Sequence, residues 1–140
     1  MKTNSKKVTF FITLIIAIGF ISCEDSNEEF TGELTIHDKV SLLENGEWLL
    51  KGFENRVMYT FKNGQRFTFY GADSVFADKA IPGTEDYSIS GDFLILDLNF
   101  GNIKTYELQF SCDHNIAEFY EDGALHTTMY KKDSNYEQCL

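Results

Sequence analysis

Three histidines and two pairs of adjacent carboxylates are the side chains in this sequence best suited to catalysis or to metal binding. His37, His114 and His126 fall in a predicted helix, a predicted turn and a predicted strand, so the pattern favours surface or packed histidines over a metal site. The pairs Glu85-Asp86 and Glu121-Asp122 lie beside predicted turns, where carboxylates are normally solvated, whereas general acid catalysis needs a desolvated one. An inward-facing cluster of His126 with an acid would favour an enzyme. The sequence contains no Gly-x-Ser-x-Gly, Walker, His-Glu-x-x-His or Cys-x-x-Cys motif, so we predict no catalytic residue, no metal, no cofactor and no enzymatic activity.

The three cysteines point to export rather than to catalysis. Cys112 lies two residues from His114, but neighbours in sequence rarely form a nucleophile–base pair. Cys23 follows a hydrophobic leader, which leaves Cys112 and Cys139 as an even pair in a compartment that permits disulfides. The sequence favours a Cys112–Cys139 disulfide, with two free thiols as the alternative, because spacing along the chain does not fix the distance between two Cα atoms.

Residues 1–22 have the plan of a signal peptide. A basic segment, Met1–Lys7, precedes an uncharged and mostly apolar run of 14 residues, Val8–Ile21, whereas a spanning helix needs about 20. The segment Phe20-Ile21-Ser22-Cys23 resembles a bacterial lipobox, in which the cysteine receives lipid before the peptide is cut. An ordinary secretory signal is the alternative. We predict cleavage after residue 22 and a lipid on Cys23 that holds the chain to a membrane.

An acidic tether, residues 23–37, follows the leader. Its start, Glu24–Glu29 (EDSNEE), is typical of a solvated segment and also resembles the acidic export signal of surface lipoproteins of the Bacteroidetes. The resemblance implies a protein of the bacterial cell envelope, lipid-anchored to the outer membrane on its periplasmic face or on the cell surface. Residues 23–140 carry nine basic and 22 acidic side chains, a net charge of −13. This charge excludes nucleic acid as a partner and would favour a basic protein partner.

The remaining residues, 38–140, have the pattern of one all-β domain with a short N-terminal helix. Asp38–Asn45 is the predicted helix, with Asp38 as its cap and Gly46 at its end. About eight strands follow, separated by turn residues such as Asn63-Gly64. They are predicted at Trp48–Phe53, Arg56–Lys62, Arg66–Tyr70, Tyr87–Ser90, Phe93–Leu98, Ile103–Phe110, Ile116–Tyr120 and Ala124–Tyr130, with room for a further short strand around Ser74–Ala77. Short connections make neighbouring strands antiparallel, so we predict an up-and-down meander that closes into a small barrel.

Gly46-Glu47-Trp48 opens the first predicted strand directly after the helix, as the Gly-x-Trp motif of lipocalins does. Residues 59–64 (YTFKNG) and 83–94 (GTEDYSISGDFL) are similar to the lipocalin-like domains of Bacteroidetes lipoproteins. The resemblance covers about residues 42–131. It implies a lipocalin-like β-barrel in which Trp48 is a structural residue that packs across the barrel floor.

Aromatic side chains are the best candidates for a ligand-binding surface. An eight-stranded barrel is just wide enough to be filled by side chains or to hold one small ligand. Strand alternation predicts that Glu107 faces outward, opposite to Tyr106, whereas Glu118 has the parity of Tyr120 and is a candidate polar anchor inside the barrel. An outward position for Glu118 is the equal alternative. The candidate lining residues are Tyr59, Phe61, Phe67, Phe69, Phe93, Tyr106, Phe110, Glu118 and Tyr120.

These features predict a lipid-anchored extracytoplasmic binding module that holds a small apolar or amphipathic ligand in its barrel. The alternative is a structural or protein-interaction lipoprotein, accessory or inhibitor-like, with a packed barrel and no ligand. An open, aromatic-lined cavity would favour the first function, and a solid core would favour the second.

Overall fold

One helix precedes the strands in the computed structural model, which describes residues 32–140. Helix α1 (Ile36–Glu44) begins two residues earlier than predicted, because Thr35 rather than Asp38 is its N-cap. The Thr35 hydroxyl accepts a hydrogen bond from the Asp38 backbone N–H (3.2 Å), and the Asp38 carboxylate accepts one from the Thr35 N–H (3.0 Å). This reciprocal capping box fixes the start of the helix and places residues 36 and 37 of the predicted tether inside the folded unit. The predicted signal peptide and Cys23 lie outside the described residues.

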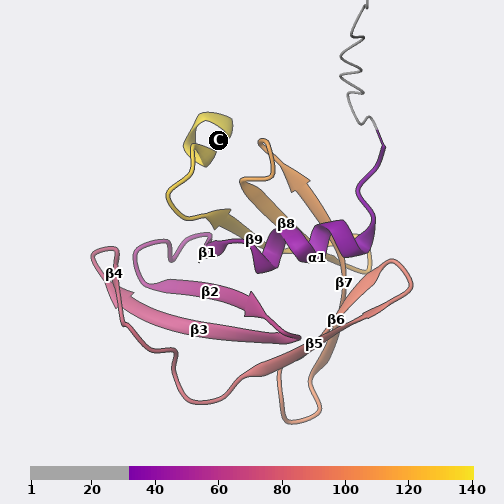
Figure 1. The fold of residues 1–140 in the computed structure, drawn as a ribbon, viewed down its shortest axis with the longest axis horizontal. Helices are drawn as coiled ribbons and strands as arrows, with labels where there is room; N and C mark the ends of the chain where they lie inside the picture. The colour runs from indigo at the N-terminus through magenta and orange to yellow at the C-terminus, as the bar shows by residue number, and fades with distance from the viewer. Residues whose placement is uncertain (1–31) are drawn as a thin grey trace, which may run out of the picture. The chain divides into compact units, whose positions relative to one another are not determined.

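Nine strands follow the helix, and eight of them form a closed antiparallel barrel (Figure 1). They are β1 (Glu47–Leu50), β2 (Val57–Lys62), β3 (Gln65–Ala72), β4 (Val75–Phe76), β5 (Glu85–Ser90), β6 (Phe93–Asp97), β7 (Ile103–Ser111), β8 (Ile116–Glu121) and β9 (Ala124–Lys131). The order around the barrel is β2-β1-β9-β8-β7-β6-β5-β3, and β2 pairs with β3 to close it, while β4 pairs with the end of β3. A 3₁₀ helix, η1 (Tyr136–Cys139), ends the chain. The predicted all-β meander and its closure into a small barrel are confirmed.

Tight turns set the register of the barrel. Asn63 and Gly64, the predicted hairpin turn, have φ angles of 51° and 77° and join β2 to β3. Positive φ at both central positions is the geometry of a type I′ turn, for which Asn-Gly is a preferred pair. Asp122 and Gly123, with φ of 50° and 78°, make the corresponding turn between β8 and β9. Such two-residue turns match the twist of the strands that they join, which is why consecutive strands pair.

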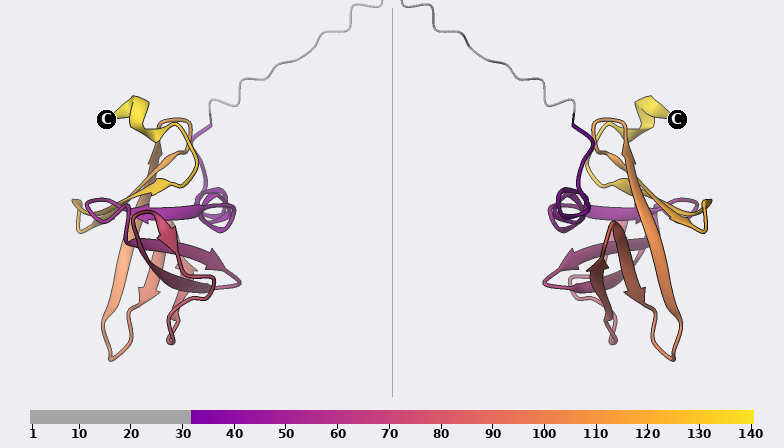
Figure 2. Two further views of the ribbon diagram at one scale, coloured as in Figure 1. Left: turned by 90° about the vertical axis from the view of Figure 1, so that its left-hand side faces the viewer. Right: turned by 90° about the vertical axis from the view of Figure 1, so that its right-hand side faces the viewer.

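The interior of the barrel is filled by side chains. Phe61 stacks on Phe119 with 6.5 Å between ring centroids, and Phe119 meets Tyr106 edge to face at 5.5 Å. Helix α1 contacts β2 as well as β6 and β7, so it covers one end of the barrel, and Figure 2 shows it along its axis beside the strands. The remaining core residues are Ile36, Val40, Leu43, Trp48, Leu94, Leu96, Leu108, Ala117 and Met129. Within residues 32–140 the interior is a packed core, so there is no open, aromatic-lined cavity for a ligand inside the barrel.

Trp48 joins the helix to the barrel. Its side chain is fully buried, its indole Nε1–H donates to the Leu43 carbonyl (2.9 Å), and its ring meets Phe110 edge to face at 5.9 Å. Gly46 makes this position possible, because a Cβ on residue 46 would lie 2.8 Å from the Trp48 Nε1 atom. The motif is therefore a packing unit in which the glycine leaves room for the indole, and the indole satisfies a carbonyl in the last turn of the helix.

A second apolar cluster, the outer row, lies on the outside of the barrel. Cross-strand pairing aligns one outward residue from each of five neighbouring strands, and these are Phe69, Met58, Leu49, Tyr130 and Ile116. The C-terminal segment packs over this row, since the Tyr136 ring stacks on Tyr130 with 4.4 Å between centroids. A disulfide between Cys112 and Cys139, with 5.9 Å between the Cα atoms, ties η1 to the turn after β7. The barrel thus has apolar side chains on both its inner and its outer face, and the C-terminal segment covers part of the outer face.

Candidate functional site

The nine predicted lining residues divide between the two faces of the barrel. Tyr59, Phe61, Tyr106 and Phe110 face inward and pack in or against the core. The other five face outward, and they are Phe67, Phe69, Phe93, Glu118 and Tyr120. For these five residues the prediction of an interior lining position is wrong.

The pairing of β2 with β3 explains the error for the two phenylalanines of β3. Phe61 is a core residue and pairs with Arg66, so Arg66 faces inward and its neighbour Phe67 faces outward. Thr68 pairs with the inward residue Tyr59 and faces inward, and Phe69 pairs with Met58 and faces outward. Alternation along a strand separates its two faces but does not say which face is inside. Here the outer face also carries apolar residues, since Phe69 belongs to the outer row.

Strands β6 and β8 show the same effect. Phe93 is 45% exposed at the start of β6. On β8, Ala117 and Phe119 are core residues, so the alternate positions Glu118 and Tyr120 face outward. The Tyr120 hydroxyl donates to the Glu118 carboxylate (3.4 Å) on that outer face. Glu118 is therefore not an anchor inside the barrel.

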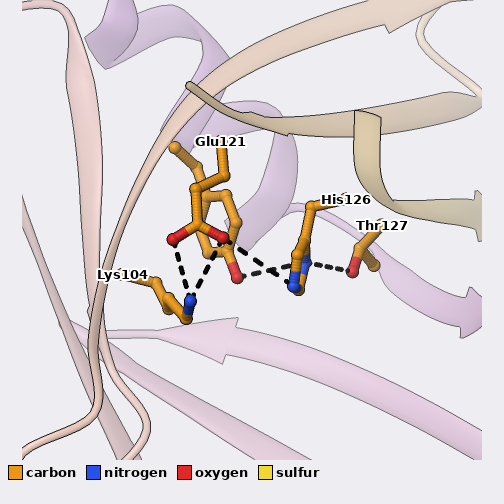
Figure 3. A network of polar contacts seen from close by, with 5 residues as sticks. Lys104, Glu121, His126 and Thr127 are labelled. Atoms are coloured by element: carbon orange, nitrogen blue, oxygen red, sulfur yellow. Dashed lines mark hydrogen bonds and ion pairs between the residues drawn. The ribbon is translucent and has the colours of Figure 1, made fainter. Parts of the chain in front are cut away.

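Charged and polar side chains gather at the end of the barrel where the β6–β7 and β8–β9 connections lie. We call them the mouth cluster: Arg66, Glu85, Lys104, Tyr106, Glu121 and His126. It contains two ion pairs, Arg66 Nη2–Glu85 Oε2 (2.6 Å) and Lys104 Nζ–Glu121 Oε1 (2.9 Å), and Figure 3 shows the second with its neighbours. The Arg66 and Glu85 side chains are only 11% and 23% exposed, so the first pair is largely withdrawn from solvent.

A β-bulge turns His126 into the mouth cluster. The register of β8 and β9 shifts beside Tyr120, so that His126 falls between two paired residues of β9. An extra residue of this kind changes the direction of the side chains around it. His126 Nδ1 lies 3.2 Å from the Tyr106 hydroxyl, and His126 Nε2 lies 3.9 Å from a Glu121 carboxylate oxygen (Figure 3). Hairpin pairing thus joins a histidine, a tyrosine and a carboxylate from three strands.

Burial or nearby charge raises the pKa of three groups in or beside this cluster: Tyr106, Tyr59 and Lys104. Burial, reinforced by the Glu121 carboxylate, raises the pKa of the Tyr106 hydroxyl. Burial also raises the pKa of Tyr59, even though the Arg66 guanidinium lies 4.5 Å from the centre of its ring and opposes the shift. The hydrogen bond from Lys104 to Glu121 raises the pKa of the lysine. The two tyrosines are therefore neutral hydroxyls and the lysine is a cation.

The mouth cluster places His126 beside an acid, which is the arrangement that would favour an enzyme. Both oxygens of Glu121, however, already accept hydrogen bonds from Lys104 (2.9 and 3.2 Å). The Tyr106 hydroxyl keeps its proton at neutral pH, because burial raises its pKa. These groups hold one another in place and balance charge, and they present hydrogen-bond donors and acceptors at the mouth of the barrel.

A cavity of about 560 Å³ lies beside the mouth cluster. Its walls come from β3, the segment before β5 and the β6–β7 loop, and they are formed by Thr68, Ile81, Pro82, Gly83, Glu85, Asn99 and Phe100. Two hydrogen bonds hold these walls together, from the Ile81 N–H to the Thr68 carbonyl (2.8 Å) and from the Asn99 side chain to the Thr84 carbonyl (3.3 Å). The volume is in the range of small-ligand sites, roughly 300–1,000 Å³. Glu85 belongs both to this cavity and to the ion pair with Arg66.

Sequence reasoning missed the two cations of the mouth cluster, Arg66 and Lys104. For Lys104 a signal was present, since it has the same strand parity as Tyr106 and Leu108, the predicted inward face. The inward direction of Arg66 depends on its pairing with Phe61, a contact between strands that the sequence of β3 does not contain.

Comparison with protein-family models, with curated proteins and with solved structures gives no match for this chain. Within residues 32–140 there is no helix of the length and apolar character needed to cross a membrane. The same residues include no group of three or more His, Cys, Asp or Glu side chains placed to hold a metal ion. The fold and its site define a small, closed antiparallel β-barrel with a filled interior and a charged mouth.

Proposed function

We propose that this protein is a non-enzymatic, lipid-anchored binding module of the bacterial cell envelope that holds a small amphipathic ligand. The ligand sits at the mouth of the barrel, because packed side chains occupy the interior. The observation that carries the proposal is the cavity of about 560 Å³ whose wall includes Glu85, the ion-pair partner of Arg66. Ile81, Pro82 and Phe100 supply apolar walls for the body of the ligand, and Glu85, Asn99 and Thr68 supply polar groups for its head.

The lipid anchor on Cys23 is the second part of the proposal. It is supported by the 14-residue apolar run and the lipobox-like segment that ends at Cys23. We expect the Cys23→Ser variant to lose all acyl mass and to leave the membrane pellet, as measured by intact-mass analysis and fractionation of cells. Cys139→Ser is the matched control and should stay in the pellet. A Cys23→Ser chain that still pellets with membranes would show a different mode of attachment.

A blocking substitution in the cavity tests ligand binding. The soluble residues 32–140, which form one compact unit, are purified without detergent and offered a total lipid extract of their own envelope. Native mass spectrometry should show a discrete added mass that disappears on denaturation. In Thr68→Phe the new ring occupies the cavity, so we expect at least a tenfold loss of the adduct, which corresponds to about 1.4 kcal/mol of binding free energy.

Ser88→Phe is the matched control for Thr68→Phe, because it adds the same ring at an exposed position of β5. It should leave the adduct unchanged. An adduct that survives Thr68→Phe would place the ligand elsewhere on the barrel. A bare mass for the wild type in the presence of the extract would contradict ligand binding.

A second candidate function is supported by the filled interior itself. A barrel packed with Phe61, Phe119 and Tyr106 is a rigid scaffold, and such a scaffold can act through its outer surface without any ligand. In this case the protein is an interaction lipoprotein, accessory or inhibitor-like, and its net charge of −13 after residue 22 favours a basic partner.

A further inference from the structure

We infer that the exposed apolar surface formed by Phe100 of the β6–β7 loop and Ile103 at the start of β7, with the Asp97 carboxylate beside it, is a docking surface for a basic protein partner. This inference rests on the second candidate function. Because Phe100 is also part of the cavity wall, the chemical nature of the adduct at position 100 distinguishes docking of a protein from binding of a ligand. The second candidate function leaves the interface unlocated, and the inference places it at the β6–β7 loop with Phe100 as its anchor.

Phe100 is the most exposed large apolar side chain of the described residues. It is fully exposed, and Ile103, three residues later, is 60% exposed. Figures 1 and 2 show the β6–β7 loop projecting from the end of the barrel away from η1. Exposed aromatic side chains of this kind are the residues that most often anchor protein interfaces. The contact would bury apolar surface that the chain itself leaves in water.

The loop holds Phe100 in one defined conformation. Phe100 and Asn99 have φ angles of 54° and 68°, in the left-handed region that a bulky residue such as phenylalanine rarely adopts. Backbone bonds between Leu98 and Asn102 (2.9 Å) and between Asn102 and Asn99 (3.0 Å) close the loop. The Asp97 carboxylate accepts a further bond from the Asn99 N–H (2.8 Å). Because the backbone of the loop is already held by these bonds, its ordering costs little conformational entropy when a partner binds.

The charges around Phe100 select the partner. Asp97 pairs with Ile103 across the hairpin, and Glu85 shares the cavity wall with Phe100. Arg66 balances Glu85 and Lys104 balances Glu121, so Asp97 is the carboxylate beside Phe100 whose charge these two ion pairs leave in place, and residues 23–140 as a whole carry a net charge of −13. A partner with lysine or arginine side chains around an apolar pocket complements this surface, and the net charge of the chain would speed its approach.

The same charges argue against two other occupants. A second copy of this chain would bring an equally acidic surface to the interface, and like charges at an interface are unfavourable. An anionic membrane surface would repel the loop for the same reason. An adduct with a second copy and an adduct with lipid are both distinguished from a protein-partner adduct by photo-crosslinking.

Site-specific photo-crosslinking in the full chain, in intact cells of its own source, tests the inference. p-Benzoylphenylalanine is placed at position 100 and, as a matched control, at position 53, where Phe53 is 53% exposed on the β1–β2 connection. We expect a protein adduct at position 100 and none at position 53. The cross-linked peptide of the partner should carry net positive charge, and the yield should fall at least fivefold between 0.05 and 0.5 M NaCl.

Binding of the identified partner is then measured with purified proteins. Phe100→Ala should weaken it at least tenfold and Phe53→Ala less than twofold, with unchanged melting temperatures for both variants. Thr68→Phe, which blocks the cavity, should leave the adduct at position 100 intact, so the interface and the ligand site are separated. The inference is overturned if position 100 gives no protein adduct, or gives one with lipid, with a second copy or with an acidic segment. It is also overturned if Thr68→Phe abolishes the adduct.

Discussion

Replacing Trp48 with alanine is expected to lower the free energy of unfolding by about 3–5 kcal/mol, as removal of a large buried aromatic ring does. The side chain is fully buried between helix α1 and the barrel, and its loss would leave a void beside Phe110 and Leu43. The cost is a large share of the about 5–15 kcal/mol that holds a domain of this size folded. Urea unfolding of residues 32–140, followed by circular dichroism, measures it.

Trp48→Phe separates the packing of the indole from its hydrogen bond. The Leu43 carbonyl also accepts a hydrogen bond from the Gly46 N–H (3.3 Å), so it keeps a partner when the indole N–H is removed. We therefore expect Trp48→Phe to cost only about 1–2 kcal/mol. Equal losses for the alanine and phenylalanine variants would contradict the view that ring volume dominates.

The contact between Gly46 and the indole predicts coupling between the two positions. A Cβ on residue 46 would lie 2.8 Å from the Trp48 Nε1 and 2.9 Å from its Cε2 atom, so Gly46→Ala should cost about 1–3 kcal/mol through overpacking. In the Trp48→Phe background those atoms are absent, and the same substitution should cost less. Additive losses would mean that glycine is required at position 46 for another reason.

The fold could be predicted because its determinants are local. Asn63-Gly64 and Asp122-Gly123 favour two-residue turns, and such turns leave neighbouring strands no arrangement except antiparallel pairing. Closure into a barrel followed from the number of strands and the lack of crossover segments. The helix begins two residues before the predicted start, and the reason is again local. Thr35 and Asp38 both suit an N-cap, and the reciprocal hydrogen bonds between them make Thr35 the cap and place Asp38 inside the first turn.

The site could not be predicted in the same way, because the direction of a side chain depends on the strand beside it. Phe67 and Phe69 alternate with Arg66 and Thr68, and only pairing with β2 places the polar residues inside. His126 joins the mouth cluster through a bulge, and no pattern in β9 marks that bulge. An aromatic face suggested the interior, but the outer row also carries aromatic residues, Phe69 and Tyr130, and the C-terminal segment packs over this row.

Removal of the disulfide that ties the C-terminal segment over the outer row is expected to lower the free energy of unfolding by a comparable amount. The double variant Cys112→Ser/Cys139→Ser should lose about 3–4 kcal/mol, because the bridge closes a loop with a sequence separation of 27 in the unfolded chain. Urea unfolding measures the loss. Reduction of the wild type should lower its stability to that of the double variant, whose own stability should not respond to the reductant. A wild-type shift of less than about 1 kcal/mol on reduction would contradict the expected contribution of the bridge.

Part of this effect should come from the native state rather than from the unfolded chain. Without the bridge, η1 is held over the outer row mainly by the stack of Tyr136 on Tyr130, an interaction worth about 0.5–1.5 kcal/mol. The segment should then open before the barrel unfolds, and a dye that binds apolar surface should bind the reduced, still folded protein. Tyr136→Ala with the bridge intact is the control, because it removes the stack but keeps the segment close to the row. Dye binding in Tyr136→Ala equal to that of the reduced protein would show that the ring, not the bridge, covers the row.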